Sequence, residues 1–249
     1  MKAVLVCKGL SFAVLVGLFL VTPALGQSAA ESAYRSGDYA SAKAHWEVEL
    51  LDLEGAEARG AVLYNLGNSA FRDGLFLEAV ARYTAAIDHS PRSADYWANL
   101  ELARSRAGLE AADRGDLAAT AERLYTLLRV PELETLTFAI LALLAASLLW
   151  EALRGSRTSR ALATLLFLSL IGVAGLRTWR VETIPFNRVM VTFDGGASLR
   201  SEPSLELPVI LHLDPGAIVE RTDTLLGWMR VNSKGTSGWL EAPQVLELD

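Results

Sequence analysis

The sequence predicts a multidomain membrane protein with all-α helical hairpins, two transmembrane helices and a small all-β barrel. Small and aromatic residues recur at helical spacing in the first half of the chain. Two uncharged apolar runs follow, each close to the roughly 20 residues that span a bilayer. After Pro185, short β-rich runs alternate with turn residues. This order predicts binding modules on a membrane tether.

The first 26 residues have the layout of a secretory signal peptide. Lys2 and Lys8 precede an apolar run over residues 9–20, and small residues end at Gly26. The mature protein would begin near Gln27, with an uncleaved membrane anchor as the alternative. Cleavage would remove Cys7, the only cysteine, and with it any disulfide, thiol nucleophile or thiolate metal site.

Small residues in the helical part predict a close pair of helices. Gly67 and Ala79 are expected where two helices press together, since a larger side chain would force the backbones apart. Gly74 is expected between the helices with positive φ, and Pro91 beyond the end of the second helix. These features predict a helical hairpin between residues 60 and 93.

The same residues resemble the tetratricopeptide (TPR) family, whose repeat is 34 residues long. One full unit covers residues 60–93, a partial unit precedes it, and residues 94–106 resemble a capping helix. The resemblance implies a TPR domain over residues 27–107. The matching positions of the full unit are Leu63, Leu66, Gly67, Ala79, Tyr83, Ala86 and Pro91.

Two membrane-spanning helices are predicted over residues 133–153 and 161–179. Residues 108–132 are expected to form a helical linker that enters the membrane, lies on its surface or is simply solvated. The loop over residues 154–160 carries three arginines, which predicts a cytoplasmic position and places both flanking regions on the exported side. Trp150 and Trp179 stand at the ends of the apolar runs, where headgroups are expected. The alternative is a buried helical hairpin in a soluble domain.

Residues 187–249 predict a small barrel with six short strands. Within them, four pieces in order resemble the bacterial SH3-like (SH3b) family, which implies an exported interaction module often found near cell-wall peptides. These pieces cover residues 197–204, 213–216, 227–231 and 238–240.

The TPR resemblance implies a concave, protein-binding face made by the first helix of each repeat. Asn side chains on such a face can hold the backbone of an extended peptide. Asn68 and Asn99 match two positions of the family's carboxylate clamp, but Tyr64 stands where the clamp has lysine, which argues against that clamp. Asn65 and Asn99 are equally explained as ordinary consensus residues. The candidate residues are Tyr64, Asn65, Asn68, Phe71, Arg72, Asn99 and Arg106.

The candidate ligand face of the SH3b-like domain comprises Arg200, Trp228 and Trp239. Tryptophan is largely buried on average, so the interpretation of both rings as core residues is favoured over a ligand platform. Arg200 either orients the following loop or makes an internal hydrogen bond to a turn carbonyl. These alternatives require the structure.

No catalytic, metal or cofactor site is predicted. His45, His89 and His212 are scattered without ligand spacing, and no nucleophile, base and orienting group form a recognisable set. The net charge is −6, and both predicted exported domains are acidic, so nucleic acid is not an expected partner. A non-enzymatic binding protein is therefore expected.

The complete order of segments resembles the BatE-type proteins of the Bat aerotolerance operon. That resemblance implies partners among membrane-anchored von Willebrand factor A (VWA) domain proteins and a role in an envelope or oxidative-stress complex. We expect a membrane-tethered scaffold in the inner membrane. The alternative is a cell-wall sensor or anchor whose SH3b-like domain binds peptidoglycan while the TPR region acts as a spacer.

Overall fold

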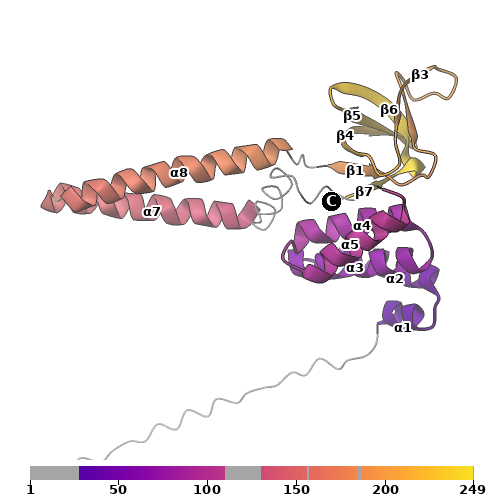
Figure 1. Ribbon diagram of the computed structural model, residues 1–249, viewed down its shortest axis with the longest axis horizontal. Coiled ribbons are helices and arrows are strands. Elements are labelled where there is room, and N and C mark those ends of the chain that lie inside the picture. Colours follow the sequence, from indigo (N-terminus) through magenta and orange to yellow (C-terminus); the bar gives the residue numbers. More distant parts are fainter. Residues whose placement is uncertain (1–27, 110–129, 156, 184–186, 249) are drawn as a thin grey trace, which may run out of the picture.

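The computed structural model describes residues 28–109, 130–155, 157–183 and 187–248 (Figure 1). The predicted signal peptide and most of the predicted linker lie outside these ranges. Three parts are visible in Figure 1: a helical region, a long pair of helices and a β-sheet domain. We use "helical region" for residues 28–109 and "β-sheet domain" for residues 187–248.

The helical region consists of five antiparallel neighbours joined by short turns: α1 (Ala29–Arg35), α2 (Tyr39–Asp52), α3 (Ala56–Arg72), α4 (Phe76–His89) and α5 (Ala94–Arg106). Side chains cap the first two helices, because the Ser28 hydroxyl accepts from the Glu31 amide and the Asp38 carboxylate from the Ser41 amide. Gly74 has φ +82°, as its position between α3 and α4 predicted.

The contact between α3 and α4 depends on the missing side chain of Gly67. A Cβ at this position would lie 2.6 Å from the ring of Tyr83, which fills the space beside the glycine. Ala79 is fully buried, as are Leu63 and Leu66 nearby. The predicted close approach of the two helices at Gly67 is therefore confirmed.

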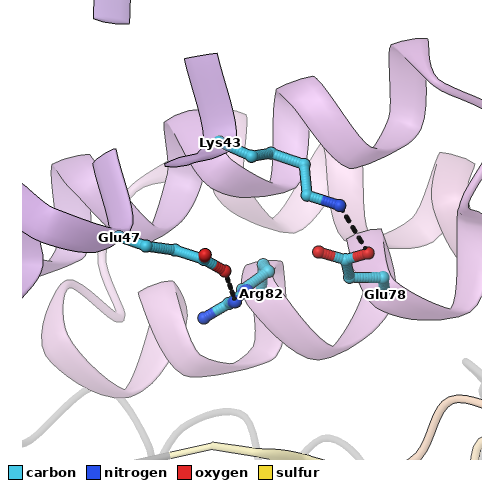
Figure 2. Close-up of polar contacts among 4 residues, drawn as sticks. All are labelled: Lys43, Glu47, Glu78 and Arg82. Atoms are coloured by element: carbon cyan, nitrogen blue, oxygen red, sulfur yellow. Dashed lines mark hydrogen bonds and ion pairs between the residues drawn. The ribbon is translucent and has the colours of Figure 1, made fainter. Parts of the chain in front are cut away.

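Two ion pairs join α2 directly to α4 (Figure 2). Lys43 Nζ lies 2.8 Å from Glu78 Oε2, and Arg82 Nη2 lies 2.6 Å from Glu47 Oε1. On each helix the two charged residues are four positions apart, so they project from the same face. Each helix contributes one basic and one acidic side chain. They fix the register of α2 against α4.

The helices α7 (Val130–Arg154) and α8 (Arg157–Thr183) form a long antiparallel hairpin. By length and composition, both could cross a membrane, over Pro131–Arg154 and Arg157–Thr178. Only 11% and 6% of their most apolar windows are buried, so the alternative of a hairpin buried in a soluble domain does not fit the described residues. Polar contacts occur at both ends, with Arg177 against Glu134 and Arg160 against Glu151.

The β-sheet domain is one antiparallel sheet with the strand order β3-β2-β6-β5-β4-β1-β7. All six predicted strands are present, and β2, which the sequence marked only as part of a motif, makes a seventh. Alternate residues of these strands bury Val189, Val191, Leu199, Val231 and Leu240 in one core. The bounds are β1 (Arg188–Val191), β2 (Ala197–Arg200), β3 (Val209–Leu213), β4 (Ile218–Leu225), β5 (Trp228–Ser233), β6 (Thr236–Glu241) and β7 (Val245–Glu247), with a short 3-10 helix η1 (Ala242–Gln244) before β7.

The helical region and the β-sheet domain share a second buried cluster. Val189 and Val191 of β1 face the core of the sheet, so Met190 between them points to the opposite side and packs with α4, where it is fully buried. Leu248 joins the same cluster beside Val80 and Ala81 of α4. Strand β1 is consequently buried on both faces, and the two parts form one packed body.

Candidate binding site

Three of the side chains predicted for the concave face, Tyr64, Asn68 and Asn99, meet in a network between α3, α4 and α5. Asn68 Oδ1 accepts hydrogen bonds from the Tyr83 hydroxyl at 2.8 Å and from Asn99 Nδ2 at 3.1 Å. Asn99 Nδ2 also lies 2.8 Å from the Tyr64 hydroxyl, and the Tyr64 ring stacks on Tyr96 with centroids 4.4 Å apart. We call these five residues the tyrosine–asparagine network.

Ionisation of Tyr83 would break this network. Burial is the main cause that raises the pKa of Tyr83 far above its ordinary value, and the neighbouring Tyr64 adds to the effect. The hydroxyl therefore stays protonated and remains a donor to Asn68 throughout the physiological pH range. The network fixes Asn68 and Asn99 in one orientation, with part of their hydrogen-bonding capacity already used.

The remaining predicted residues surround this network. Asn65 lies three residues before Asn68 on α3 and is half-buried. Phe71 is half-buried and meets Phe76 edge-on, with ring centroids 5.3 Å apart. Arg72 is exposed, and a hydrogen bond with Tyr34 raises its pKa further above the ordinary value. Arg106 is exposed at the end of α5. The structure thus gathers Tyr64, Asn68 and Asn99 and leaves two arginines at the margin.

Sequence reasoning assigned no site role to Tyr34, Tyr83 or Tyr96. The sequence marked Tyr83 only as a matching position of the repeat, whereas its hydroxyl also orders Asn68. Tyr96 stands three residues before Asn99 on α5, and that spacing places both on one face of a helix. This spacing was an available signal for the Tyr64–Tyr96 stack.

A second candidate surface lies on the outer face of the sheet. Trp239 of β6 is paired directly with Arg200 of β2 and with Arg230 of β5, so the three side chains share one face as a row. Trp228 lies on the same face, two residues from Arg230 on β5. Arg230 was not among the predicted residues, and only the strand register reveals it.

The interpretation of the two tryptophans as core residues is wrong. Trp228 and Trp239 are half-buried and stand outside the buried cluster of the sheet, whose members are their immediate chain neighbours Met229 and Leu240. Both side chains therefore lie on the outer face of the sheet, where each is partly exposed. Arg200 donates a hydrogen bond to the Leu207 carbonyl in the loop between β2 and β3. This is the predicted internal bond to a turn carbonyl, and it also holds the loop that follows Arg200.

Among the described residues, no group of three or more histidine, cysteine, aspartate or glutamate side chains is placed to hold a metal ion. Both candidate surfaces combine aromatic rings with amide or guanidinium donors. Such surfaces suit peptides or sugars, which offer apolar faces and hydrogen-bonding groups together.

The family model of the bacterial SH3 domain matches residues 194–246, about a fifth of the chain. This segment of the β-sheet domain is a bacterial SH3 domain, which is a module that binds proteins or peptidoglycan. No curated protein and no solved structure matches the chain. Arg188, Met190 and Leu248, which contact the helical region, all lie outside the matched segment.

Proposed function

We propose that this protein is a non-catalytic, membrane-tethered scaffold that holds protein partners on the exported side of the inner membrane. The bacterial SH3 domain supports a binding role and an extracellular or periplasmic position. The helices α7 and α8 supply the tether. The helical region acts as a short TPR array whose partner site is centred on the tyrosine–asparagine network.

The packing of α4 against β1 is the observation that carries this proposal. These elements lie on either side of the α7–α8 hairpin in the sequence, yet Met190 and Leu248 are buried beside Val80. Two segments can touch only on the same side of a membrane, so an even number of crossings must separate them. A two-pass hairpin meets that requirement and agrees with the arginines of the 154–160 loop.

Joining two binding surfaces in one body raises the effective concentration of one bound partner for the other. The resemblance to BatE-type proteins suggests membrane-anchored VWA-domain proteins as partners and an envelope or aerotolerance process as the context. No nucleic acid, metal or cofactor is part of the proposal.

Photo-crosslinking in native membranes tests the partner site. A photoreactive residue at Asn65 adjoins the network without replacing one of its members, and the same probe at Val48 of α2, which is 63% exposed, is the matched control. Capture of a membrane-anchored VWA-domain protein from Asn65 and not from Val48 is expected. Equal capture from both positions would exclude the site.

A wall sensor or anchor is the second candidate, and the Arg200–Trp239–Arg230 row favours it because aromatic faces and guanidinium groups suit peptidoglycan. Co-sedimentation of the whole protein with purified peptidoglycan separates the two functions. Retention that is lost in Trp239→Ala would support the anchor. An absence of retention would leave the scaffold as the proposed function.

A further inference from the structure

The turn between β4 and β5 carries leucine where the backbone favours other residues. Leu226 has φ +39° and Gly227 has φ +85°, so both central residues of this two-residue hairpin turn are left-handed. Asparagine, aspartate and glycine suit the first of these positions, whereas a bulky side chain is unfavourable there. Leu226 is also 94% exposed. Both the conformation and the exposure oppose leucine, so folding alone does not explain this residue.

Neighbouring side chains extend the apolar tip. Leu225 is 46% exposed and is the direct cross-strand partner of Trp228, which is half-buried on the same face. Two leucines and an indole at the end of a narrow hairpin match the composition of segments that enter the headgroup region of a bilayer. Leucine contributes apolar area there, and tryptophan prefers the interface itself.

The strand register directs this tip toward the end of the domain where the chain arrives from α8. Strand β4 runs antiparallel to β1, pairing Ile218 with Met190 and Glu220 with Arg188. The Arg221 amide bonds the Asn187 carbonyl, and β4 then continues to Leu225, past the start of β1. Four further residues add roughly 13 Å in that direction.

The tether keeps this end of the domain close to the membrane. Helix α8 ends at Thr183 and β1 begins at Arg188. Even fully extended, the intervening residues reach less than about 20 Å. The tip therefore points toward the membrane surface, and the short connection to α8 keeps the domain near that surface.

We propose that the β4–β5 hairpin tip, residues 225–228, enters the headgroup region of the membrane crossed by α7 and α8. This inference rests on the proposed membrane-spanning topology. A lipid contact at the tip gives the domain a second anchor point besides α8 and fixes its orientation. The Arg200–Trp239–Arg230 row then keeps one orientation relative to the membrane plane.

The β5–β6 hairpin is a matched internal control. Its turn, Lys234-Gly235, has φ +50° and +88°, so it repeats the geometry of the Leu226-Gly227 turn. It lies at the other end of β5 and carries lysine in place of leucine. The two turns differ in chemistry and position while sharing the backbone shape.

Spin labels on the whole protein in bilayers of phosphatidylethanolamine and phosphatidylglycerol test the inference. Single cysteines replace Leu226, Lys234 or Phe138 in a Cys7→Ser background, and Phe138 on α7 is 71% exposed. Power saturation compares accessibility to oxygen, which concentrates in lipid, with accessibility to a water-soluble nickel chelate. We expect a several-fold higher oxygen-to-nickel ratio at Leu226 than at Lys234, and a higher ratio still at Phe138.

Three outcomes would overturn the inference, and they are distinguishable. Equal oxygen-to-nickel ratios at Leu226 and Lys234, with Phe138 in lipid, would contradict the lipid contact of the tip but not the membrane-spanning topology. Shielding of Leu226 from both reagents would indicate a protein contact instead. A water-accessible Phe138 would remove the membrane-spanning topology and the tip contact together.

A pair of asparagine substitutions gives an independent readout without loss of the fold, because asparagine tolerates left-handed φ. With the label moved to Thr224, Leu226→Asn is expected to lower the oxygen-to-nickel ratio several-fold. Lys234→Asn is expected to leave it unchanged. An unchanged oxygen-to-nickel ratio in Leu226→Asn would contradict insertion of the tip into the headgroup region.

Discussion

Arg188 at the start of β1 forms an ion pair with Asp88 near the end of α4, one hundred residues earlier in the chain. Both side chains are largely shielded, with 13% and 33% exposure. The pair flanks Met190, so a charged contact and an apolar contact together join the helical region to the β-sheet domain.

A double-mutant cycle on Asp88→Asn and Arg188→Met measures this contact. We expect a coupling energy of roughly 1–2 kcal/mol, because the pair is partly desolvated. Asp88 has a further interaction, so its single substitution includes other losses that the cycle subtracts. Denaturant unfolding of the four proteins gives the coupling, and a value near zero would mean that the pair does not join the two parts.

Met190→Ala tests the apolar side of the same interface. Removing a fully buried methionine side chain is expected to lower the free energy of unfolding by about 2–5 kcal/mol. Its cross-strand partner Ile218 is 45% exposed, so Ile218→Ala is a suitable control with a smaller loss. Limited proteolysis should also cut Met190→Ala between the two parts faster than the wild type. Equal effects of the two substitutions would contradict the shared core.

Gly67→Ala distinguishes close helix packing from simple helix propensity. In an exposed helix this change stabilises by up to about 1 kcal/mol. Here the added Cβ meets the Tyr83 ring, so we expect a loss of about 1–3 kcal/mol in thermal or denaturant unfolding. Combining it with Tyr83→Leu should recover part of the loss. A stabilising Gly67→Ala would show that α3 and α4 are further apart than the structure has them.

Tyr83→Phe links the tyrosine–asparagine network to pH. At neutral pH the variant should lose about 1 kcal/mol with its hydrogen bond to Asn68. The folded protein keeps the Tyr83 proton above pH 10.0, the ordinary pKa, whereas the unfolded chain releases it. The free energy of unfolding of the wild type should therefore fall as the pH rises through that value, and its excess over that of Tyr83→Phe should become smaller. A difference in the free energy of unfolding between the two proteins that is constant between about pH 8 and pH 11 would contradict the raised pKa.

Local sequence signals predicted most of the fold. The small residues at Gly67 and Gly74 placed the helical hairpin, since Gly74 permits the turn and Gly67 leaves room for Tyr83 of the following helix. Turn residues placed six of the seven strands. The strand β2 was missed because its four residues are too few to establish the alternation of apolar and polar side chains, and pairing with β3 and β6 defines it.

The candidate sites were harder to predict because they depend on register between distant elements. Asn68 and Asn99 were found by position, but Tyr83 and Tyr96 join them only through packing of α4 and α5. The docking of β1 had one available signal. Val189-Met190-Val191 is an uninterrupted apolar run, which is typical of a strand buried on both faces.

The contact between Met190 and α4 also bears on how the protein is made. The residues of α4 are synthesised before the α7–α8 hairpin and those of β1 after it. For a hairpin that crosses the membrane as we propose, this contact cannot form until both helices have been inserted and β1 has reached the side of the membrane where α4 lies. Closure of the interface would then mark the completion of biogenesis, and a chain stalled after one crossing would leave the apolar surface of α4 open to quality-control proteases.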